Sequence, residues 1–74
     1  MNKTSDNLVL CAVYPDAPTA SLAIGLLAAN GIQSIADNAT ISTILPVVGG
    51  IRVMVRERDL DAARAALRAG DMLQ

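Results

Sequence analysis

From Ala17 to Ile51 the chain carries a single charged residue, Asp37. This segment makes up nearly half of a 74-residue protein. A domain of that size has little interior, so it cannot bury the whole segment. We therefore expect much of this weakly polar surface to be covered by a second subunit or by another protein.

The core has to be built from small aliphatic side chains. Hydrophobic residues make up 53% of the chain, yet Tyr14 is its only aromatic residue. Aliphatic side chains bury less surface each than Phe or Trp, so a monomer of this size is marginally stable. Oligomerisation is a usual remedy, whereas the single cysteine, Cys11, cannot close an internal disulfide.

Charge and hydropathy exclude several classes of protein. The formal net charge is −1 with six Lys and Arg, which argues against a general nucleic-acid binder. There is no apolar run of about 18 residues, so no transmembrane helix is predicted. Residues 1–7 are polar and lack the apolar stretch of a secretory signal, and we expect a flexible tail there. Together with the lone cysteine, these features predict a cytoplasmic protein.

The first half of the chain predicts a strand followed by a capped helix. Leu8–Val13 is apolar at every position, which favours a strand buried on both faces. Asp16 is placed to cap a helix over residues 17–30, with Pro18 in its first turn and Gly31 after its end. On this helix we expect one side to face the core and the other to face outward. The predicted core side holds Leu22, Ala23, Leu26 and Leu27, and the outward side holds Ser21, Ile24, Gly25 and Ala28.

The second half predicts two further strands and a second helix. Residues 32–37 favour a strand, and residues 38–50 are compatible with either a short strand or an apolar loop. Ile51–Arg56 alternates between apolar and mainly polar residues, which is typical of a strand. A helix should begin near residues 57–59 and end at Gly70. Its predicted core stripe consists of Leu60, Ala63, Ala66 and Leu67.

The order β-α-β-β-α predicts an α+β fold, a truncated ferredoxin-like sandwich in which two helices cover one face of a three-stranded mixed sheet. We expect the first and third strands to be adjacent and parallel, with the second strand antiparallel on the far side of the third. Residues 8–70 would form a single domain, with a short tail over residues 71–74. The first strand is then an apolar edge, and the sheet face without helices, which includes Met54, is partly apolar.

Several local motifs occur in an order that points to a known family. They are Tyr14-Pro15-Asp16 before a helix, Gly25-Leu26-Leu27 through Asn30-Gly31-Ile32, Val48-Gly49-Gly50-Ile51 before a strand ending at Val55, and Asp59, Ala63 and Leu67 in the last helix. Over Leu8–Leu67 the chain resembles the putative prokaryotic signal-transducing proteins, a family of short α+β domains.

The resemblance implies a bacterial protein with a role in signal transduction. The family is similar in fold to the nitrogen-regulatory P-II proteins, although a fold does not fix a function. Its members commonly carry acids or lysines on the outward side of the first helix. Here those positions are Ser21, Ile24 and Ala28, and this departure strengthens the case for a contact surface.

Catalysis is not expected. The chain has no histidine, which excludes imidazole acid–base chemistry and histidine-type metal ligation. Cys11 has no base near it in sequence, and the carboxylates are scattered over helix starts and a polar helix face. The sequence therefore predicts neither an enzyme nor a site for a metal or cofactor.

The leading hypothesis is an interaction module, a homodimer or a partner of another protein, that works through apolar contacts. The predicted contact residues are Ile24, Ile41, Ile44, Leu45, Val47, Val48 and Met54. For residues 41–48 the alternative is that they pack over their own domain.

The second hypothesis is a sensor of small anions or metabolites. Gly49 and Gly50 could expose backbone N–H groups to an anion, and Arg52 and Arg56 lie on one face of the strand that follows. The alternative for these four residues is a tight turn followed by two solvated arginines.

Overall fold

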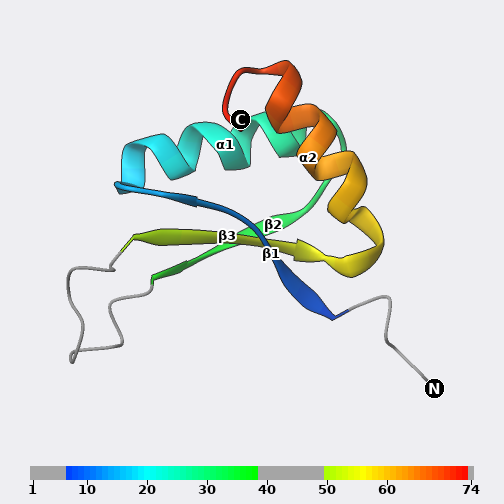
Figure 1. Cartoon of the computed structure of the whole chain (residues 1–74), viewed down its shortest axis with the longest axis horizontal. Helices are drawn as coiled ribbons and strands as arrows, with labels where there is room; N and C mark the ends of the chain where they lie inside the picture. The colour runs from blue at the N-terminus through cyan, green and yellow to red at the C-terminus, as the bar shows by residue number, and fades with distance from the viewer. Residues whose placement is uncertain (1–6, 39–49, 74) are drawn as a thin grey trace.

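The computed structural model describes residues 7–38 and 50–73. Its elements are β1 (Leu8–Tyr14), α1 (Ala17–Ala29), β2 (Ser34–Asn38), β3 (Ile51–Arg56), the 3₁₀ turn η4 (Glu57–Asp59) and α2 (Leu60–Ala69). Both helices lie on one face of the sheet (Figure 1). The predicted α+β class and the predicted order of strands and helices are confirmed.

The sheet is antiparallel throughout. Its strand order is β1-β3-β2, and β3 runs antiparallel to both neighbours. The predicted central position of β3 is confirmed, but the predicted parallel pairing of β1 with β3, and hence the mixed sheet, is wrong. The crossover through α1 joins β1 to β2, so these two strands run in the same direction without being hydrogen-bonded to each other. The third strand returns from β2 and fits between them in the opposite direction.

The two faces of the sheet follow from the alternation along β3. Val53 and Val55 are fully buried on the face that the helices cover. The intervening residues Arg52, Met54 and Arg56 therefore lie on the opposite face, which has no helix over it among the described elements. We call these the covered face and the open face.

A β-bulge in β1 changes the alternation of that strand. The register shifts between Leu10 and Ala12, so Cys11 and Ala12 are both buried although they are adjacent. Leu8, Leu10 and Val13 pair with Arg56, Met54 and Arg52, which places them on the open face. The prediction that this strand is buried on both faces is wrong, because one of its faces lies under the helices and the other is about half exposed.

Helix α1 begins and ends as predicted. The Thr19 backbone N–H donates to the Asp16 carboxylate at 2.8 Å, which caps the first turn. After the last turn Gly31 adopts a φ of 77°, a conformation that glycine tolerates best. Both boundaries could be predicted because they depend only on neighbouring residues.

The core side of α1 differs from the prediction. The buried residues are Ala20, Ala23 and Leu27, whereas Leu22 is 65% exposed. Ile24, predicted to point outward, packs partly against the core. The helix is apolar on nearly all sides, so its periodicity does not select a face, and packing against the sheet does.

Helix α2 buries the predicted stripe. Ala63 and Leu67 are fully buried, and Leu60 and Ala66 pack against the core. The helix ends at Gly70.

The residues after α2 are held against the domain. The Tyr14 hydroxyl donates to the Met72 carbonyl at 2.9 Å, and Met72 and Leu73 pack against the core. The residues predicted as a C-terminal tail are therefore part of the packed structure as far as 73. Within the described ranges, no helix combines the length and the hydropathy needed to cross a membrane.

Candidate functional site

The open face presents large aliphatic side chains to solvent. Leu8, Leu10, Val13 and Ile35 are between 46% and 52% exposed. Leu10 and Ile35 pair with Met54 from either side, so the three form an apolar row across the three strands. A row of this kind on a small domain is typical of a surface that another molecule covers.

The open face also holds one ion pair. The Arg52 guanidinium contacts the Asp37 carboxylate at 2.6 Å, from directly opposite positions on β3 and β2. Both side chains are about 40% exposed. The two charges are therefore compensated within the chain and do not require a counter-charge from a partner.

The structure separates the residues predicted to hold an anion. Gly50 lies at the start of β3, Arg52 is engaged with Asp37, and Arg56 lies at the other end of the strand. At about 3.3 Å per residue, Gly50 and Arg56 are on the order of 20 Å apart. Gly49 lies outside the described residues. The described members of this set do not surround one space.

Gly50 has a structural explanation of its own. Its φ is 155°, a value that other residues rarely adopt. A Cβ added there would come within 3.1 Å of the Val13 side chain and 3.3 Å of the Tyr14 carbonyl oxygen. The glycine therefore allows the chain to enter β3 close beside β1.

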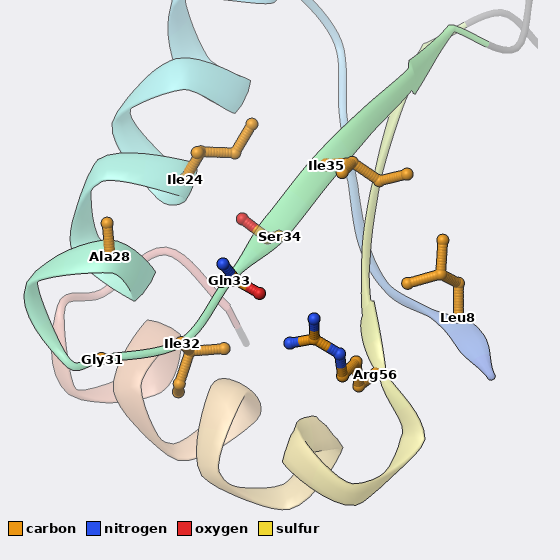
Figure 2. A pocket seen from close by; sticks show the side chains of 9 residues that line it. All are labelled: Leu8, Ile24, Ala28, Gly31, Ile32, Gln33, Ser34, Ile35 and Arg56. Atoms are coloured by element: carbon orange, nitrogen blue, oxygen red, sulfur yellow. The ribbon is translucent and has the colours of Figure 1, made fainter. Parts of the chain in front are cut away.

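A groove of about 580 Å³ lies beside the start of β2. Its walls come from α1, the loop that follows it, β2 and the ends of β1 and β3 (Figure 2). The lining residues are Leu8, Ile24, Ala28, Gly31, Ile32, Gln33, Ser34, Ile35 and Arg56. This volume is within the range of small-molecule sites in proteins.

The groove is mainly aliphatic, with a few polar groups. The Arg56 side chain makes no hydrogen bond or ion pair with any residue that the structure describes. Ser34 also lines the groove, and its buried hydroxyl has no partner within the described ranges. Figure 2 shows the Arg56 guanidinium directed toward the start of β2, where Gln33 lies. Buried or half-buried polar groups without partners are uncommon, and they often mark a site where a ligand or water binds.

The predicted contact residues fall in three places. Met54 lies at the centre of the open face, and Ile24 lies on the wall of the groove. Ile41, Ile44, Leu45, Val47 and Val48 lie outside the described residues. The sequence prediction did not include Ile35, which joins the open face to the groove. Its register with Met54 could not be found without knowing how β2 pairs with β3.

Nucleophilic chemistry is not supported at Cys11. The side chain is 5% exposed, and burial raises the pKa of its thiol, with a partly opposing effect of the Arg64 charge. A buried thiol held in its neutral form is a poor nucleophile. Burial likewise raises the pKa of the Tyr14 hydroxyl, which donates to the Met72 carbonyl. Among the described residues there is no group of three or more side chains suited to hold a metal ion.

The fold and the open face define a small ferredoxin-like α+β domain with an apolar sheet face. A family model described as putative prokaryotic signal transducing protein matches residues 12–71. The chain belongs to this family, as its motifs predicted. No curated protein and no solved structure matches the chain.

Proposed function

We propose that this chain is a non-catalytic interaction module that contributes to signal transduction by pairing the open face of its sheet with the same face of a second copy. The observation that carries the proposal is the row of half-exposed Leu, Val and Ile side chains around Met54. The signalling context rests on the description of the family. The absence of histidine from the chain and the burial of Cys11 support a role without catalysis.

Burial of the open face would supply stability that the small core lacks. Apolar surface removed from water contributes about 25 cal/mol per Å². The core contains one aromatic residue, and its largest fully buried side chains are two leucines and two valines. A second sheet packed on the open face would add a further apolar layer, as in other face-to-face sheet packings.

A second copy suits the charges of the open face. Its central ion pair, Arg52 with Asp37, is closed within one chain, so these two charges do not oppose the pairing of two such faces, and the further charge of Arg56 lies at the end of β3, away from the pair. Two-fold pairing requires a surface that is complementary to itself, and an apolar row flanked by an internally neutral pair satisfies that condition. A partner of strong opposite charge would gain little from this surface.

The test is the solution mass of the purified protein from micromolar to nanomolar concentration, measured by ultracentrifugation. We expect a dimer that dissociates on dilution. Leu10→Glu should abolish the dimer, because it places a charge in the middle of the apolar row. Circular dichroism should show that this variant keeps its fold, since Leu10 is 46% exposed in the single chain.

The matched control is Leu22→Glu. Leu22 is 65% exposed on α1, so the same substitution adds the same charge away from the open face. This variant should dimerise like the wild type. A wild-type protein that stays monomeric at micromolar concentration would contradict the proposal. So would a dimer that Leu22→Glu dissociates and Leu10→Glu does not.

A further inference from the structure

The groove beside the start of β2 combines apolar walls with a cation that has no partner among the described residues. Leu8, Ile24 and Ile35 supply the aliphatic surface, and Arg56 supplies the charge. An apolar cleft with a few well-placed polar groups is the usual form of a small-molecule site. An aliphatic lining with one cation predicts a ligand that has an apolar part and a negative charge.

We propose that this groove binds a small aliphatic carboxylate, with its carboxylate on the Arg56 guanidinium and its hydrocarbon chain along the walls toward Ile24 and Ile35. A guanidinium binds a carboxylate through two parallel N–H···O hydrogen bonds. Arg52, on the same face of β3, is already engaged with Asp37. Among the described residues that line the groove, Arg56 is the cation and none is acidic.

The polar groups near Arg56 support a carboxylate rather than a neutral hydrocarbon. Gln33 and Ser34 line the same groove, and the Ser34 hydroxyl lacks a partner within the described ranges. Ser34 pairs with Val55, so its hydroxyl lies on the covered-face side of β2, and Gln33 is the polar residue toward which the Arg56 guanidinium is directed. A purely apolar ligand would leave the guanidinium half-buried without a counter-charge, which is unfavourable.

The groove shares Leu8, Ile35 and Arg56 with the open face, so the proposed dimer would cover part of it, and binding and association have to be measured separately. The groove extends past the edge of the sheet to Ile24 and Ala28 on α1 (Figure 2). The mass of each sample should be measured with and without ligand. Loss of binding would then be distinguished from loss of association, because the two properties are measured separately.

The test uses octanoate, below its micelle concentration, titrated into the ¹⁵N-labelled full chain and followed by the amide signals of Gln33, Ser34 and Ile35. We expect saturable shifts confined to the residues of the groove. Acetate, which lacks the chain, and 1-octanol, which lacks the charge, should each bind about tenfold more weakly or worse.

Substitutions separate the role of Arg56 from a general effect of charge. Arg56→Gln should weaken octanoate binding about tenfold or more, and Arg56→Lys should weaken it less, because lysine keeps the charge but not the paired donors. The control is Arg64→Gln, which removes an exposed arginine of α2 that does not line the groove. This variant should bind octanoate like the wild type.

Results of three kinds would overturn the proposal. The first kind is binding that does not depend on charge, seen as equal binding of 1-octanol and octanoate or as equal binding of octanoate by Arg56→Gln and the wild type. The second is a set of shifts spread over the whole open face, as nonspecific binding of an amphiphile would give. The third is a short peptide with a free C-terminal leucine binding about tenfold more tightly than octanoate, which would make a protein terminus the source of the carboxylate.

Discussion

The covered and open faces of the sheet are built from similar aliphatic residues and differ in what lies over them. Val53 and Val55 on the covered face are fully buried, whereas Leu10 and Ile35 on the open face are nearly half exposed. Both helices lie on the covered face, and no described element lies over the open face (Figure 1). The hydrophobic content of this sheet is that of an interior layer, whereas the described elements of the chain cover only one of its two faces.

The largest effect should come from comparing one leucine on each side of this boundary. Leu27→Ala removes a fully buried side chain between α1 and the covered face and should lower the free energy of unfolding by about 2–5 kcal/mol. Leu10→Ala on the open face should cost about 1 kcal/mol or less in the single chain. Urea denaturation at low protein concentration measures both. Equal costs would mean that the open face is covered in solution even at that concentration.

A smaller effect should follow from Tyr14→Phe at the rim of the covered face. The substitution removes the hydrogen bond from the Tyr14 hydroxyl to the Met72 carbonyl and should cost about 0.5–1.5 kcal/mol. Amide exchange near Met72 should become faster, because this bond holds the residues after α2 on the domain. Unchanged exchange there would show that the packing of Met72 and Leu73 alone is sufficient.

The start of α1, which covers the sheet, should give a pH dependence. Hydrogen bonds from Thr19 lower the pKa of the Asp16 carboxyl below its ordinary value of 3.8. The folded state therefore holds the charged form more strongly than the unfolded state does. The stabilising contribution is complete above the unfolded pKa and is lost as the pH falls through the lowered folded pKa.

Asp16→Asn separates the cap from its titration. Asparagine also caps helices but does not ionise in this range. The stability of this variant should therefore fall less steeply than that of the wild type as the solution is acidified below about pH 4. Parallel pH profiles of thermal unfolding for the two proteins would contradict this account.

The smallest effect should come from the ion pair on the open face. Both partners are about 40% exposed, so solvent screens the attraction between Arg52 and Asp37. A double-mutant cycle with Asp37→Asn and Arg52→Gln should give a coupling free energy of about 0–1 kcal/mol. A clearly larger coupling would mean that the pair is shielded from water, as a second sheet packed over the open face would make it.

The accuracy of the sequence predictions depended on whether a feature is local. The cap at Asp16, the end of α1 near Gly31 and the alternation of Ile51–Arg56 were all predictable, because each needs only neighbouring residues. The core stripe of α2 was also predictable, since that helix has one apolar side and one charged side. The exposed position of Leu22 was not, because α1 is apolar on nearly all sides.

The candidate groove could not be predicted from the sequence, because its walls come together only in the complete fold. Arg56 was predicted as an anion ligand together with residues at the other end of β3, where the pattern of glycines lay. Its neighbours in the structure come instead from β1, α1 and the start of β2, which are distant in sequence. Only the antiparallel register, with Ser34 opposite Val55, brings the start of β2 beside the end of β3.

The α+β order, the boundaries of the helices, the membership of the family and the excess of apolar surface could all be predicted before the fold was known. These depend on local conformational preferences and on composition, which a chain carries whatever its tertiary contacts. The direction of strand pairing, the side of α1 that faces the core, the bulge at Cys11 and the surroundings of Arg56 were decided only by the tertiary structure. Each of these features depends on how several similar apolar surfaces pack against one another. That packing is set by contacts between residues that are distant in sequence.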